Sequence, residues 1–116
     1  MQTYRGSCHC GAISYDVTMD PPEKAFACNC SICSRSGTLL AFVPADQFSL
    51  VADGKRVDYQ FGKKQMHHEF CATCGVRSFV HGADGKGKEM TAINLRCLHD
   101  FDEYALPVEM WDGAKT

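Results

Sequence analysis

The chain has 116 residues and a mass of 12.8 kDa, a length that suits one domain and excludes a second. Apolar residues make up 45% of it and charged residues 22%, and no apolar run approaches the roughly 20 residues of a membrane-spanning helix. The formal net charge of -2 argues against nucleic acid as a partner, because proteins that bind it carry a strongly basic surface.

Alternation of apolar residues with a period of two predicts a mostly β domain, since no long helical pattern occurs in the sequence. The predicted strands include residues 13–17, 57–61, 76–80 and 90–95. Turn residues separate these strands at Asp20–Pro22, at Asp53–Lys55 and across Gly82–Lys88, the last of which is typical of a hairpin loop with a mobile tip.

Smaller features complete the predicted fold. Short helical turns are expected after Pro44 and near residues 100–104. The five histidines are expected to be polar surface or strand residues, with an acid–base role or metal ligation as the alternative. The large aromatic residues predicted to lie in the core are Phe26, Phe42, Phe70, Phe79 and Trp111.

The eight cysteines are the unusual feature of the composition. The N-terminus lacks the apolar segment of a secretory signal, so the expected location is the reducing cytoplasm, where disulfides do not persist. Clustered thiols in that compartment favour metal binding, and zinc in particular, over a disulfide framework or a redox Cys-x-x-Cys pair. The cysteines form one Cys-x-Cys pair, one Cys-x-Cys-x-x-Cys group, one Cys-x-x-Cys pair and one single residue: Cys8 and Cys10; Cys28, Cys30 and Cys33; Cys71 and Cys74; and Cys97.

Zinc takes four protein ligands in structural sites, and three plus an open position in catalytic ones. The seven clustered cysteines divide as four plus three, whereas all eight would divide as four plus four if Cys97 joined the second group. Two cysteine pairs each suit one edge of a tetrahedron, and the group of three suits a local site. A zinc ion with three thiolates carries a negative net charge, which suits an incoming thiol better than the generation of hydroxide. The predicted substrate is therefore a thiol.

Four motifs resemble those of the glutathione-dependent formaldehyde-activating enzyme family, which also includes centromere protein V. In chain order they are Gly6–Gly11 (GSCHCG), Cys28–Gly37 (CNCSICSRSG), Phe70–Gly75 (FCATCG) and Asn94–Leu98 (NLRCL), and the resemblance extends over about residues 4 to 100. It implies a β-tent zinc fold of several small antiparallel sheets, formed by one domain over residues 1–116.

The resemblance also implies two zinc sites, of which the second can be partly occupied. The implied ligands are Cys8, Cys10, Cys71 and Cys74 for a structural zinc, and Cys28, Cys30 and Cys33 for a catalytic zinc. The founding activity of the family implies addition of glutathione to formaldehyde to give S-hydroxymethylglutathione, a reaction classed with the carbon–sulfur lyases. Because glutathione has two carboxylates, Arg35 and Arg96 are candidates to bind them.

Two alternatives remain open from the sequence. A non-catalytic zinc module that binds a protein partner would need Cys97 or a histidine as fourth ligand of the second site. The same chemistry could instead act on another small thiol. The sequence indicates no nucleic-acid or membrane partner, and it does not determine the oligomeric state.

Overall fold

The computed structural model describes residues 1–61, 66–83 and 86–112. In these ranges no helix is long and apolar enough to cross a membrane. The described elements, ten strands with one α-helix and three short 3-10 helices, are β1 (Gln2–Ser7), β2 (Ile13–Met19), β3 (Ala25–Cys28), α1 (Ser31–Ser36), β4 (Leu40–Pro44), η1 (Ala45–Gln47), β5 (Phe48–Asp53), β6 (Arg56–Tyr59), β7 (Met66–Cys71), β8 (Phe79–Ala83), β9 (Glu89–Asn94), η2 (Leu95–Cys97), η3 (Glu103–Ala105) and β10 (Val108–Trp111).

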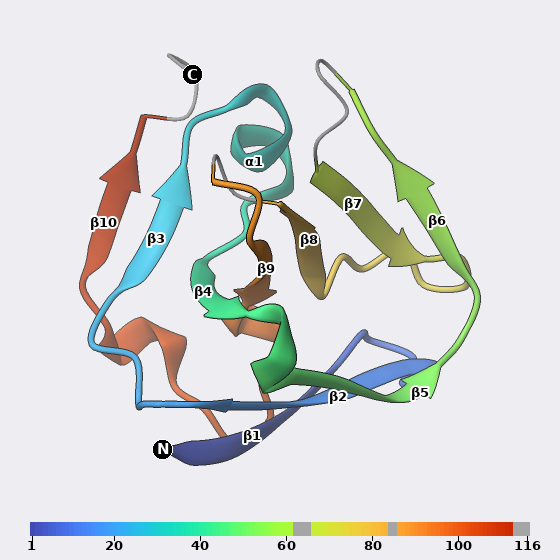
Figure 1. The fold of residues 1–116 in the computed structure, drawn as a ribbon, viewed down its shortest axis with the longest axis horizontal. Helices are drawn as coiled ribbons and strands as arrows, with labels where there is room; N and C mark the ends of the chain where they lie inside the picture. Colours follow the sequence, from blue (N-terminus) through green and yellow to red (C-terminus); the bar gives the residue numbers. More distant parts are fainter. Residues whose placement is uncertain (62–65, 84–85, 113–116) are drawn as a thin grey trace.

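The strands form two sheets. The smaller sheet has the order β1-β2-β5 and is antiparallel, and the larger has the order β10-β3-β4-β9-β8-β7-β6. Figure 1 shows the small sheet as a base, with the strands of the large sheet standing over it and α1 at the end farthest from the base. The mostly β, tent-like fold predicted from the sequence is confirmed.

The core lies where the base meets the larger sheet. Strand β2 alternates between buried and half-buried residues along its whole length, because one of its faces packs against the core. The fully buried ring of Tyr15 lies at its centre, with ring centroids 5.0 Å from Phe48 and 6.0 Å from Phe79. Burial of large apolar side chains such as these provides the main favourable contribution to folding.

Several local predictions hold. The turn at Asp53–Lys55 joins β5 to β6, and the segment Gly82–Lys88 joins the antiparallel strands β8 and β9. The tip of that second loop, residues 84–85, lies outside the described residues. The helical turn expected after Pro44 is η1, and the one expected near residues 100–104 is η3.

Other local predictions are wrong. Residues 76–78 are not part of a strand, because β8 begins only at Phe79. Phe42 and Trp111 are 40% and 49% exposed, although we expected both in the core. The reason is position in the sheet: β10 is an edge strand, and Phe42 faces outward from β4. The ring centroids of Phe42 and Trp111 are 5.8 Å apart on this outer face.

Gly6 generates a test of the core packing. A Cβ atom placed there would lie 2.5 Å from the Tyr15 ring, which is buried and has no room to move. We expect Gly6→Ala to lower the free energy of unfolding by about 1–3 kcal/mol, the usual cost of overpacking. Denaturant unfolding of metal-loaded protein measures this, with the exposed Ser49→Ala as control; equal midpoints for the two variants would contradict it.

Candidate metal centres

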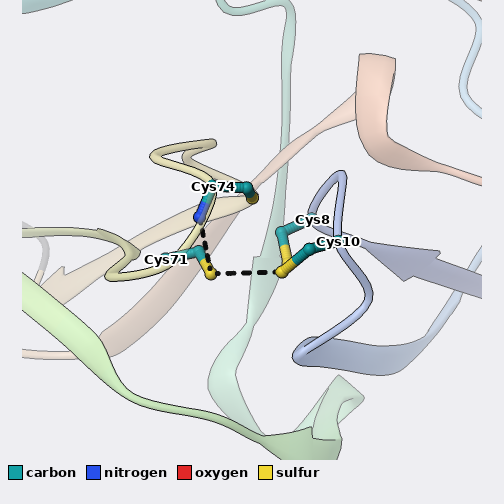
Figure 2. A group of neighbouring side chains, drawn as sticks. All are labelled: Cys8, Cys10, Cys71 and Cys74. Carbon is teal, nitrogen blue, oxygen red and sulfur yellow. Dashed lines mark hydrogen bonds between the residues drawn. The ribbon is translucent and has the colours of Figure 1, made fainter.

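The first cysteine group joins two distant parts of the chain. Cys8 and Cys10 lie in the loop after β1, and Cys71 and Cys74 lie at the end of β7 and in the turn that follows (Figure 2). The four Sγ atoms lie within 4.8 Å of one another, and two separations are 3.7 Å (Cys8 to Cys10) and 3.6 Å (Cys10 to Cys71). Four sulfur atoms at about 2.3 Å from a tetrahedral zinc would be about 3.8 Å apart. The donor set therefore fits a tetrahedral, thiolate-preferring metal ion.

The backbone around this group supplies hydrogen bonds to sulfur. The amide of Ile13 donates to the Sγ of Cys8 at 3.4 Å, and the amide of Cys74 donates to the Sγ of Cys71 at 3.5 Å. The turn after Cys71 needs a positive φ of 79° at Gly75, which glycine adopts without strain. Backbone amides of Val76 and Cys10 lower the pKa of the Cys74 thiol to about 6. Such donors stabilise the thiolate form that metal binding requires.

The second group, Cys28, Cys30 and Cys33, is local in sequence. It lies where β3 ends and α1 begins, and its three Sγ atoms are also within 4.8 Å of one another. The amide of Cys30 donates to the Sγ of Cys28 at 3.5 Å, and the helix ends at Gly37, whose φ is 66°. The strand–turn–helix segment thus brings three thiols together without help from distant residues.

Within the described ranges, no Cys, His, Asp or Glu side chain joins this second group as a fourth potential ligand. Cys97 lies elsewhere: its half-buried thiol interacts electrostatically with Cys8 and Cys74 of the first group. Each of the two groups can hold a metal ion. One group has four cysteines and the other has three, and Cys97 belongs to neither.

The two arginines singled out in the sequence lie on or beside α1, and both are exposed. Arg35 donates from Nη1 to the Ser31 carbonyl within its own helix at 2.8 Å. Arg96 donates from Nε to the Gly37 carbonyl at 3.2 Å and from Nη1 to the Tyr104 hydroxyl at 3.2 Å. The structure therefore brings both guanidinium groups near the helix that carries Cys33.

Sequence reasoning missed two buried residues beside α1, Arg77 and His68. Arg77 donates from Nη1 to Nδ1 of His68 at 3.0 Å and from Nη2 to the Ser36 hydroxyl. Because guanidinium groups only donate, Nδ1 of His68 accepts and the ring proton is on Nε2. The available signal was a charged residue within the segment 76–80, which was predicted to be a strand.

His68 lies in strand β7, one of the two positions expected of the histidines, but its side chain is buried and lines the space beside α1. The other four histidines are exposed or half-buried. His67 contacts Asp58 at 2.8 Å, His81 contacts Glu69, and His99 contacts Ser7 at 2.8 Å.

Electrostatics differ between the thiols and the imidazole near Arg77. Burial and the neighbouring Cys30 raise the pKa of Cys33 to about 12, although the positive charge of Arg77 acts in the opposite direction. Burial and the positive charge of Arg77 together lower the pKa of His68 to about 4. The imidazole of His68 is therefore neutral at physiological pH.

A pH titration tests this environment. Since the pKa of His68 falls from 6.5 to about 4 on folding, the unfolded chain binds more protons between these values. This residue should therefore reduce stability as the pH falls from 6.5 to 4, by at most about 3 kcal/mol. NMR titration of the His68 ring should give a midpoint near 4, and His68→Gln should flatten the slope of stability against pH. A midpoint above 6 would contradict a buried, neutral ring.

Comparison with known proteins agrees with the fold. The family model of the glutathione-dependent formaldehyde-activating enzyme matches residues 3–114. The crystal structure of a protein from Rhodobacter sphaeroides is similar, with a TM-score of 0.78 and 27% sequence identity, and the match covers 90% of this chain and 99% of that one. The chain described here belongs to the glutathione-dependent formaldehyde-activating enzyme family.

Proposed function

We propose that this protein is a two-zinc enzyme of the carbon–sulfur lyase type that condenses a small thiol with a small aldehyde, with glutathione and formaldehyde as the pair. The observation that carries the proposal is the group Cys28, Cys30 and Cys33, which offers three thiolate ligands in a chain of this family. Three protein ligands leave a coordination position for substrate, as in catalytic zinc sites.

In the proposed reaction the thiol sulfur attacks the aldehyde carbon. A carbon–sulfur bond forms, and the carbon–oxygen double bond of the carbonyl becomes a single bond. The proton lost by the thiol ends on the former carbonyl oxygen. When bound at Cys28, Cys30 and Cys33, zinc supplies a soft positive charge that favours the thiolate form of the substrate. Cys28, Cys30 and Cys33 would hold that ion at the turn between β3 and α1.

Free energies indicate how such a site would act. Lowering a thiol pKa from about 8.5 to about 7 raises the thiolate fraction at neutral pH to one half, worth roughly 1–1.5 kcal/mol. The intrinsic nucleophilicity of sulfur also falls with its pKa. Holding the two reactants together can contribute several kcal/mol more, and therefore accounts for most of the proposed acceleration.

The group Cys8, Cys10, Cys71 and Cys74 has a structural role in this proposal. A zinc ion held by four cysteines contributes on the order of 10–16 kcal/mol, comparable with the roughly 5–15 kcal/mol net stability of a domain. Thiols kept free for metal suit a reducing compartment, so we place the protein in the cytoplasm.

The decisive variant is Cys30→Ser. We expect zinc content to fall from two ions per chain to one, calorimetric binding of glutathione to disappear, and turnover of glutathione with formaldehyde to fall at least about 100-fold through loss of thiol positioning. Cys97→Ser is the matched control, because Cys97 lies outside the group of three.

Unchanged turnover in Cys30→Ser, with one zinc still bound, would exclude the proposed site. Two bound zinc ions without any binding of glutathione to the unmodified protein would direct the search to another small thiol or to a protein partner.

Arg35 and Arg96 are proposed to contact the glutathione carboxylates from the exposed side of α1. Replacing either with Met should weaken glutathione binding about three- to tenfold, because exposed charge-assisted contacts contribute modestly. Zinc content should remain at two ions per chain. Calorimetry and metal analysis of both variants measure this, and unchanged affinity in both would remove the arginines from the site.

A further inference from the structure

Three aromatic side chains form a contiguous patch on the outer face of the larger sheet. The ring centroids of Phe26 and Phe42 are 5.7 Å apart, and those of Phe42 and Trp111 are 5.8 Å apart, both in edge-to-face contact. Phe42 and Trp111 are 40% and 49% exposed. We call Phe26, Phe42 and Trp111 the aromatic patch. Exposed apolar side chains that gather in this way mark binding surfaces, whereas isolated ones do not.

The strand register places the aromatic patch beside the group of three cysteines. Trp111 is in register with Cys28 in the parallel pair of β10 and β3, so the two side chains project from the same face of neighbouring strands about 4.8 Å apart. Phe26 precedes Cys28 by two positions and shares that face. Both residues pack against the small buried cluster that contains Cys33 and Leu40. In Figure 1, β10 and β3 lie side by side and end together near α1.

Hydrogen bonds hold Trp111 at this position. Asn29 lies between Cys28 and Cys30, and its amide donates to the Trp111 carbonyl at 3.2 Å. Its side-chain Nδ2 donates to Oδ1 of Asp112, the next residue along, at 2.9 Å. The turn that carries the cysteines and the end of β10 are therefore joined directly, and the indole keeps its place beside the three thiols.

The charges at the aromatic patch are paired with each other. The ammonium of Lys24 lies 5.2 Å from the ring centroid of Phe26 and 3.1 Å from the carboxylate of Glu109. This ion pair has no net charge, so it gives no advantage to an ionic ligand group. The rings themselves suit a neutral, planar partner, because aromatic groups attract one another in offset-stacked or edge-to-face contact.

We propose that the aromatic patch binds an aromatic ring carried by one of the two reactants, the thiol or the aldehyde, while the reacting end of that molecule lies at Cys28, Cys30 and Cys33. This inference rests on the proposed function. It extends the substrates beyond glutathione and formaldehyde to reactants with a neutral aryl group one or two carbon atoms from the sulfur or the carbonyl. The spacing of Trp111 and Cys28 on neighbouring strands sets this short distance.

Binding of paired thiols to zinc-loaded protein tests the inference. Trp111 is the only tryptophan of the chain, so its fluorescence reports on the patch directly. We expect 2-phenylethanethiol to shift the emission to shorter wavelength, because a bound ring removes water from the half-exposed indole, and ethanethiol to leave it unchanged. By calorimetry, 2-phenylethanethiol should bind at least about tenfold more tightly than ethanethiol.

Substitutions that remove a ring but keep an apolar side chain make the test specific. Trp111→Leu and Phe42→Leu should each reduce the preference for 2-phenylethanethiol over ethanethiol about three- to tenfold, and Trp111→Phe should retain most of it. Tyr59→Leu is the matched control, because Tyr59 is also 49% exposed and lies on β6, the opposite edge strand of the same sheet. This control should leave the preference unchanged.

A second arm shows which reactant carries the ring. With cysteamine as the thiol, KM is measured for phenylacetaldehyde and for acetaldehyde. If the ring belongs to the aldehyde, Trp111→Leu and Phe42→Leu should raise KM for phenylacetaldehyde alone about three- to tenfold. Specific loss in either arm supports the patch and identifies the reactant, and loss in neither arm overturns it.

Other results would also overturn the inference. Equal losses for the aryl and alkyl ligands, or loss of the second zinc in Trp111→Leu, would show that the rings only support the cysteine turn. A dimer that dissociates in Trp111→Leu, as judged by size-exclusion chromatography, would show that the patch is an interface between two copies of the chain. If Trp111→Leu does not fold, as judged by circular dichroism, Phe42→Leu decides by the same comparisons.

The proposed function and this inference can fail separately. Binding of ethanethiol and 2-phenylethanethiol with equal affinity would overturn the aromatic patch and leave the thiol site in place. In Cys30→Ser, 2-phenylethanol, which has the ring but no thiol, should still shift the emission of Trp111. That shift in a protein that binds no thiol would leave the ring site in place and exclude the thiol site of the proposed function.

Discussion

The rest of the structure depends on the approach of two cysteine pairs that are about sixty residues apart in sequence. Cys8 and Cys10 follow strand β1 of the base sheet, and Cys71 and Cys74 lie at the end of β7 of the larger sheet and just after it, so the four thiols connect the two sheets. Bringing the two pairs together closes a loop of about sixty residues and costs conformational entropy. The free energy of binding one metal ion to all four thiols would offset that cost. The packing of Tyr15 against Phe48 and Phe79 then follows from the position of the base.

The group of three cysteines depends on different forces. Its residues lie within six positions of one another, and one turn with a short helix is enough to bring their sulfur atoms together. Few long-range contacts are needed to define the ligand geometry. What the surrounding fold adds is environment: the buried wall beside Cys33, the cation of Arg77 and the neutral imidazole of His68. Ligand geometry and ligand environment are thus encoded by separate parts of the chain.

This separation explains what the sequence could reveal. The two cysteine pairs and the group of three were visible because the members of each lie within five positions of one another, and β2 was visible because one of its faces is buried along its full length. The exposure of Trp111 could not be predicted, because alternation does not distinguish an edge strand from a central one. Arg77 was missed for a related reason: its significance lies in contacts with Ser36 and His68, which are 41 and 9 positions away.

The pairing of β10 with β3 has a consequence for the order in which the protein matures during synthesis. The four residues of β10 run parallel to β3, Trp111 is in register with Cys28, and the amide of Asn29 donates to the Trp111 carbonyl at 3.2 Å. All ligands of the first cysteine group leave the ribosome before β10 does. Translation therefore permits the base sheet and the group Cys8, Cys10, Cys71 and Cys74 to bind metal before β10 is made. Strand β3, which leads into the group of three cysteines, gains β10 as its neighbour only after all the other described strands have been made.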